Sequence, residues 1–179
     1  MTNNEKIIEA LEDSNKWWRG KFEIEFKPRE IYEEIKHFLK SRQIIALTGL
    51  RRVGKTTIIL KIAEEYTKKI DAKNILYFSF DDFRNVQIRD IMNIYARVMD
   101  KDFNIGHYLL LFDEIQKLEN WEEQVKRVYD NFKNIRLILS GSESLFIRKK
   151  SRESLAGRFF EFKVKPLNFR EYLNFKGIQ

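Results

Sequence analysis

One short segment of the sequence, GLRRVGKTT at residues 49–57, combines the residue types that bind phosphate. Its first eight residues fit the spacing G-x-x-x-x-G-K-S/T, in which the glycines let the backbone curl so that successive N–H groups point at phosphate oxygens. An amphipathic helix is expected directly afterwards, and its N-terminus would add the positive end of its dipole. The segment therefore predicts a loop that binds nucleotide phosphates, and ATP is the nucleotide we expect.

The positions of this loop have separate expected roles. Lys55 should reach the β- and γ-phosphates, the Thr56 hydroxyl should bind Mg²⁺, and Thr57 should lie near the α-phosphate. Arg51 and Arg52 are unusual, since most such loops have small residues there, and they either face solvent or bind an acidic partner surface. The predicted nucleotide-binding residues are Gly49, Leu50, Arg51, Arg52, Val53, Gly54, Lys55, Thr56, Thr57 and Ser142.

Two adjacent carboxylates, Asp113 and Glu114, follow the apolar run YLLLF at residues 108–112. Such a run predicts a buried strand that carries both acids at its carboxyl end. Asp113 should hold the metal with Thr56, directly or through water, and Glu114 should orient and polarise an attacking water. A carboxylate beside the metal ligand suits water better than a second substrate, so we expect hydrolysis of ATP to ADP and phosphate. The alternative is that the pair only caps the next helix.

Two further polar residues are candidates for contact with the nucleotide. Ser142 follows the apolar run at 135–140, and a strand lying between the loop strand and the acidic strand would place it beside the γ-phosphate. A simple turn with a helix N-cap at Ser142 is an equally good interpretation. Arg158 precedes the run at 159–164, where it could stabilise transition-state charge on the nucleotide of its own chain or of a neighbour. The predicted catalytic residues are Lys55, Glu114 and Arg158.

The segments that must position these residues alternate between strand-like and helix-like patterns. The expected strands are residues 43–48, 74–80, 107–112, 135–140 and 159–164. The expected helices are residues 55–70, 88–99, 121–132, 144–154 and 168–175. Since the strand runs are apolar on both faces, helices should cover both sides of the sheet. The fold predicted is α/β, a three-layer P-loop NTPase sandwich with a mostly parallel five-stranded sheet.

Residues 1–42 are interpreted as a helical and extended leader packed on the core, which we place at residues 43–179. The expected elements of the leader are a helix at 5–14, an extended stretch at 21–27 and a helix at 28–40. Pro28 would suit the first turn of the second helix, where its missing N–H is not needed.

The composition of the chain bears on its partners and on the compartment in which it works. The net charge of +7 raises the question of nucleic acid, and Arg148, Lys149, Lys150 and Arg152 form a basic run, but such a run is more often a solvated helix face. The absence of cysteine excludes disulfides and fits a reducing compartment. No segment approaches the run of about 20 apolar residues that spans a bilayer. We therefore expect a cytoplasmic protein with no membrane contact.

Taken together, these motifs resemble the prokaryotic AAA-like ATPases of the AAA_14 type, close to the broader group of archaeal ATPases. The resemblance covers most of the chain and rests on GLRRVGKTT, LYFSFDD, LLLFDEIQ followed by Trp121, LILSGSESL, ESLAGRFFEF and PLNFREYL. It implies the additional-strand sheet order 5-1-4-3-2, binding of ATP and Mg²⁺, and a cytoplasmic location. Members of the family usually continue well past the PLNFREYL segment, so we expect this chain to lack their C-terminal region.

The function predicted is that of a Mg²⁺-dependent ATPase of the AAA-like class, a switch or motor that acts on an unknown protein or DNA partner. One alternative is a regulatory module that binds nucleotide with slow or no turnover. Another is a nucleic-acid-binding module in which ATP is secondary. A homo-oligomer would follow if Arg158 served the nucleotide of a neighbouring chain.

Overall fold

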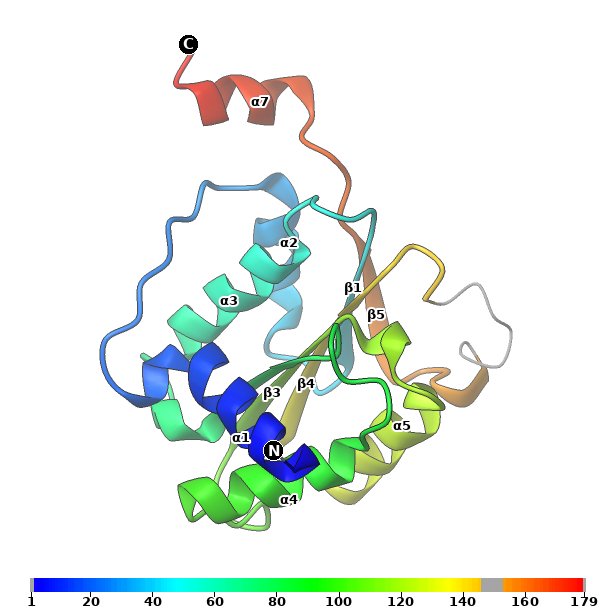
Figure 1. The fold of residues 1–179 in the computed structure, drawn as a ribbon. Helices are drawn as coiled ribbons and strands as arrows, with labels where there is room; N and C mark the ends of the chain where they lie inside the picture. The colour runs from blue at the N-terminus through cyan, green and yellow to red at the C-terminus, as the bar shows by residue number, and fades with distance from the viewer. Residues whose placement is uncertain (1, 146–152, 179) are drawn as a thin grey trace.

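The computed structural model describes residues 2–145 and 153–178 and contains one five-stranded sheet in the order β2-β3-β4-β1-β5 (Figure 1). Each pair of neighbouring strands is parallel. The strands are β1 (Ile44–Thr48), β2 (Ile75–Ser79), β3 (Tyr108–Asp113), β4 (Ile135–Gly141) and β5 (Phe159–Lys163). Read from its other edge, this is the predicted order 5-1-4-3-2, and the α/β fold class is confirmed.

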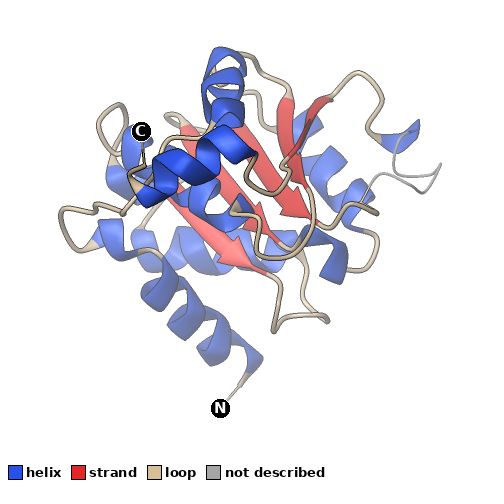
Figure 2. Ribbon diagram, turned by 90° about the horizontal axis from the view of Figure 1, so that it is seen from above, coloured by secondary structure: helices blue, strands red, loops and turns tan. Residues whose placement is uncertain are grey.

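Helices cover both faces of the sheet, which Figure 2 shows between two helical layers. The helices are α1 (Asn3–Ser14), α2 (Glu30–Phe38), α3 (Lys55–Tyr66), α4 (Ile88–Met99), α5 (Trp121–Asn131) and α7 (Phe169–Lys176). Short 3-10 helices are η1 (Lys16–Trp18), η2 (Ala72–Asn74) and η3 (Ile115–Lys117). Among the described elements, no helix is both long and apolar enough to cross a bilayer.

The strands are apolar on both sides because each side packs into its own core. In β1, Ile44 and Ala46 pack with residues of α1, α4 and α5, whereas Ile45 and Leu47 pack with residues of α2 and α3. All residues of β1 and β3 are buried. Burial on both faces explains the unbroken apolar runs of the sequence and gives the three-layer architecture.

The leader helices lie on opposite faces of the sheet, and the leader also covers the edge strand β2. The Asn15 side chain donates to the Tyr77 carbonyl oxygen at 2.8 Å and accepts from the Tyr77 N–H at 2.6 Å. The indole N–H groups of Trp17 and Trp18 both donate to the carbonyl oxygen of Ile75. These bonds satisfy backbone groups that an uncovered edge strand would leave unpaired.

The start of the second leader helix differs from the expectation. Residues 21–29, which we name the leader strap, contain no helix or strand, and α2 begins only at Glu30. The prediction that Pro28 lies in the first turn of that helix is wrong, because Arg29 is extended and its side chain enters a buried network described below. The helix expected at 144–154 falls largely on residues outside the described ranges.

Candidate nucleotide-binding site

The loop between β1 and α3 has a backbone that requires its two glycines. A Cβ on Gly49 would lie 2.3 Å from the carbonyl oxygen of Val164, which is too close for any side chain. Gly54 precedes α3 with φ of +96°, a left-handed conformation that L-residues with a side chain adopt only with strain. The loop therefore curls tightly, and the N-cap residue Gly54 has no side chain to cap the first N–H groups of α3, which a phosphate could then bind.

Lys55, the first residue of α3, extends back over this loop. Its ammonium group donates to the carbonyl oxygens of Gly49 at 3.0 Å and Leu50 at 2.8 Å. Lys55 is only 5% exposed, and these two bonds hold its ammonium group inside the curve of the loop. Here the amine can exchange its carbonyl partners for the oxygens of a triphosphate.

Asp113, at the carboxyl end of β3, is 3% exposed and is held by four donors. One oxygen accepts from the Thr56 hydroxyl at 2.6 Å and from the Tyr77 phenol at 2.9 Å. The other accepts from the Ser140 hydroxyl and, at 3.1 Å, from the N–H of Glu114. Burial, followed by the charge of Asp113, raises the pKa of Tyr77, so the phenol stays a donor. This group of oxygens suits Mg²⁺, which prefers few protein ligands, all of them oxygen.

Glu114 follows Asp113 with a left-handed backbone, at φ 53° and ψ 40°. Its N–H also donates to the Ser140 hydroxyl at 3.2 Å, and one carboxylate oxygen accepts from the Gln116 amide at 2.6 Å. A residue other than glycine in this conformation is strained, and such strain gathers at functional sites. The turn brings the Glu114 side chain to a cavity of about 450 Å³ that Lys55 and Thr56 also line.

A second, more apolar cavity of about 600 Å³ lies against the same loop. The residues that line both cavities are Arg51, Arg52, Gly54 and Thr57. The second cavity is completed by the leader strap and by residues around α7, including Phe26, Leu167 and Phe175. A polar cavity joined to an apolar one through a phosphate-type loop matches the two halves of a nucleotide, its phosphates and its base.

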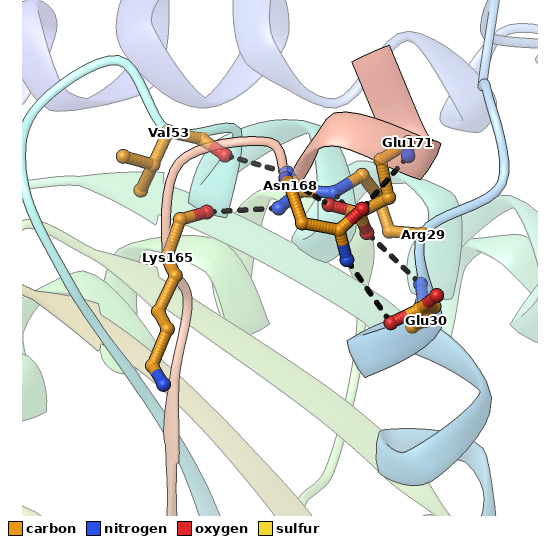
Figure 3. A network of polar contacts seen from close by, with 6 residues as sticks. All are labelled: Arg29, Glu30, Val53, Lys165, Asn168 and Glu171. Carbon is orange, nitrogen blue, oxygen red and sulfur yellow. Dashed lines mark hydrogen bonds and ion pairs between the residues drawn. The ribbon is translucent and has the colours of Figure 1, made fainter. Parts of the chain in front are cut away.

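Arg29 joins three segments beside the apolar cavity (Figure 3). The guanidinium donates to Glu171 of α7 at 2.9 Å, to the carbonyl oxygen of Val53 in the loop at 3.0 Å, and to that of Lys165 at 2.8 Å. Arg29 is 8% exposed and Glu171 is 5% exposed. The Arg29–Glu171 ion pair thus joins the leader strap to α7, and the hydrogen bond from Arg29 to Val53 joins both to the phosphate loop.

Glu171 receives further donors that fix its charge. Burial raises the pKa of its carboxyl, but hydrogen bonds from Arg29 and from the N–H groups of Asn168 and Glu30, with the charge of Arg29, outweigh burial and hold the pKa below its ordinary value. Asn168 in turn caps α7, accepting from the Glu171 N–H at 2.8 Å. The start of α7 is therefore locked to the leader through charged contacts.

Ser140, rather than the predicted Ser142, contacts the acidic pair. The Ser142 hydroxyl lies 2.8 Å from that of Ser144, and Ser142 is not among the residues that line the cavity of about 450 Å³ beside Lys55 and Glu114. Its carbonyl oxygen accepts from Leu145 N–H in a turn, which favours the simple-turn interpretation. The register pairs Phe112 with Leu139, so the next residues along, Asp113 and Ser140, lie side by side.

Arg158 lies at the other end of the sheet from the phosphate loop. Its carbonyl oxygen accepts from the N–H of Ile44, where β1 begins, whereas the loop follows Thr48, where β1 ends. Its guanidinium pairs with Asp130 at 3.1 Å. The expectation that Arg158 reaches the triphosphate of its own chain is therefore corrected, and contact with a neighbouring chain's nucleotide stays a prediction.

The structure describes the two loop arginines but not the basic run. Arg51 approaches Asp81 at 3.9 Å, and both side chains are exposed, so this pair contributes little to stability. Arg52 has a left-handed backbone with φ of 64°. The basic run at 148–152 lies outside the described residues.

The fold and the loop define a P-loop nucleotide-binding domain. A family model described as AAA domain (AAA_14) matches residues 41–173, and the chain belongs to that family. Membership supports a nucleotide-binding fold of the ATPase type, as the sequence motifs predict.

Similar proteins extend well beyond this chain. Two uncharacterized proteins of Methanocaldococcus jannaschii, MJ1637 and MJ1544, are each 34% identical to it, over 74% and 87% of this chain but only 28% and 34% of their own lengths. An uncharacterized protein of Haemophilus influenzae is 28% identical over 84% of this chain and 38% of its own. The chain thus spans about a third of the length of these relatives.

A solved structure shares the fold. The DNA polymerase III gamma subunit-related protein of Thermotoga maritima is similar with a TM-score of 0.56 and 14% identity, over 79% of this chain and 47% of that one.

Proposed function

We propose that this domain is a Mg²⁺-dependent ATPase that hydrolyses ATP to ADP and phosphate, and that it serves as a switch or motor for a protein or DNA partner in the cytoplasm. The observation that carries the proposal is the contact between the phosphate loop and the acidic strand, where the Thr56 hydroxyl donates to Asp113 at 2.6 Å. Glu114 lines the same cavity as the buried amine of Lys55.

Each residue has a defined part in this reaction. Lys55 and the loop N–H groups bind the phosphates, and Thr56 and Asp113 would hold Mg²⁺, which supplies charge neutralisation of the phosphate oxygens when bound. Glu114 orients a water and takes its proton as the water oxygen bonds to the γ-phosphorus and the bond from that phosphorus to the β-phosphate oxygen breaks. Release of phosphate from ATP by the purified chain, dependent on added Mg²⁺, tests the proposal directly.

The apolar cavity is proposed to hold the base and ribose. Leu167→Trp should fill part of this cavity and weaken ATP binding about tenfold, since the lost contacts are worth about 1.4 kcal/mol. Inorganic tripolyphosphate, which has no base, should bind the variant and the wild type equally. Both affinities can be measured by calorimetric titration.

The control for this variant is Ile105→Trp, the same kind of enlargement at an exposed residue that lines neither cavity. Its ATP affinity should equal that of the wild type. Equal losses for ATP and tripolyphosphate in Leu167→Trp would argue against a base in this cavity and for a general distortion of the loop.

A further inference from the structure

Gln116 joins Glu114 to the chain that leaves β4. Its amide nitrogen donates to the Glu114 carboxylate at 2.6 Å, and its amide oxygen accepts from the N–H of Ser142 at 3.3 Å. Gln116 lies in η3, directly after the acidic pair, and is half-buried. One side chain thus bridges the predicted water-activating group and the segment at residues 141–145, which we name the β4 exit.

Gly141 makes room for this bridge. A Cβ at Gly141 would lie 2.7 Å from the Gln116 amide oxygen and 3.0 Å from Leu145, so a side chain there would displace the amide or the β4 exit. Unlike the glycines of the phosphate loop, Gly141 does not have a left-handed backbone. Space for the Gln116 amide and for the Leu145 side chain is therefore the reason that the structure gives for a glycine at this position.

β4 and its exit hold both acids of the site. Ser140 holds Asp113 through its hydroxyl, and Ser142, two residues on, holds Glu114 through its N–H and the Gln116 amide. Asp113 has three other donors, whereas among the residues that the structure describes the Gln116 amide is the side-chain donor to the Glu114 carboxylate. The direction of the Glu114 side chain therefore depends on where the β4 exit holds Gln116.

We propose that Gln116 is a positioning residue that holds the Glu114 carboxylate where it can activate the water that attacks ATP, and that it couples this carboxylate to the β4 exit. This inference rests on the proposed ATPase function. A carboxylate at the edge of an open cavity has several rotamers available, and a fixed donor selects one of them. Displacement of a catalytic group by about 1 Å can cost about 100-fold in rate, so the bridge should affect turnover rather than binding.

Gln116→Met, which keeps the length of the side chain and removes both hydrogen bonds, tests the proposal. Phosphate release and ATP affinity should be measured on the full chain. We expect kcat to fall by about 10- to 100-fold, with KM and the ATP affinity within about twofold of wild type. Such a split between kcat and KM is not produced by a general loss of structure.

Gln124 provides a matched control. Its amide, like that of Gln116, makes two hydrogen bonds, but both go to backbone groups: it accepts from the N–H of Ile88 at 2.8 Å and donates to the carbonyl oxygen of Glu119 at 2.9 Å. Gln124 lines neither cavity. Gln124→Met should lower the melting temperature and leave kcat unchanged. An equal fall of kcat in the two variants would overturn the proposal.

A spectroscopic measurement tests the bridge without turnover. The side-chain NH₂ resonances of Gln116 should shift in Glu114→Ala, which removes the acceptor, and in Gly141→Ala, which crowds the amide oxygen. Unshifted resonances in both variants, or an unchanged or raised kcat in Gln116→Met, would overturn the positioning role alone. Absence of turnover in the wild type would instead overturn the proposed function and this inference with it.

Discussion

Glu114→Gln should lower phosphate release from ATP by about 100-fold or more, because the amide cannot accept the proton of the attacking water. ATP affinity should stay within about twofold of the wild type, since binding depends on the phosphate loop, Lys55 and the apolar cavity rather than on this carboxylate. The Gln side chain keeps the size of Glu and can still contact Gln116. Phosphate release and calorimetric titration of the same preparation measure the two quantities.

Glu119→Gln is the control for this change, because it removes the same charge at an exposed residue a few positions along the chain that lines neither cavity. Its turnover should match that of the wild type. Turnover retained by Glu114→Gln would show that Glu114 does not activate water, and loss of binding together with turnover would assign it a structural role.

Arg29→Met should destabilise the domain by about 3–5 kcal/mol, because it leaves the buried carboxylate of Glu171 without its charge partner. It also removes donors from the carbonyl oxygens of Val53 and Lys165. The double variant Arg29→Met/Glu171→Leu should lose less stability than Arg29→Met alone, since no buried charge remains. Urea unfolding measures both, and a double variant less stable than the single one would contradict the account of this ion pair.

The same pair predicts how stability depends on pH. The folded pKa of Glu171 lies below its ordinary value of 4.5, so the carboxylate contributes stability above pH 4.5, and this contribution is lost as pH falls through the folded pKa. The stability difference between wild type and Glu171→Gln should therefore be at its full size near neutral pH and shrink as pH falls below 4.5. A difference that stayed constant from pH 7 to pH 3 would contradict the lowered pKa.

The phosphate loop and the acidic pair were predictable because their signals are local. Each combines a buried strand with the residues that directly follow it, and in the structure the Thr56 hydroxyl contacts Asp113 at 2.6 Å. The sheet order, by contrast, came from the family resemblance, since the spacing of apolar runs does not specify which strands are neighbours. It was confirmed by the order of the strands in the structure.

The sequence predicted Ser142 beside the γ-phosphate and did not single out Ser140, because the contact of Ser140 with Asp113 depends on register. Ser140 and Ser142 are two residues apart, so in an extended strand both would point to the same face of the sheet. Only the pairing of Phe112 with Leu139 places Ser140 beside Asp113. The contact of Tyr77 with Asp113 likewise joins neighbouring strands and has no local signal. Gln116 is close to Glu114 in sequence, but its second partner, Ser142, is distant.

The position of Arg158 at the sheet edge away from the phosphate loop follows from the predicted strands alone. In a parallel sheet a residue that precedes a strand lies at the amino-terminal edge, whereas the phosphate loop follows the carboxyl end of β1. The Arg29–Glu171 pair could not have been found in this way, because its members are 142 residues apart and meet only when the leader strap and α7 close over the loop.

Titration of the purified chain with ATP in the presence of Mg²⁺, compared with Lys55→Ala, tests the central claim most directly. The buried ammonium group of Lys55 lies at the centre of the phosphate loop, so we predict saturable binding of one ATP per chain by the wild type and a loss of about 100-fold or more in affinity in Lys55→Ala, at unchanged melting temperature. Absence of binding by the folded wild type, or equal binding by the two proteins, would contradict the assignment of this loop as the nucleotide site.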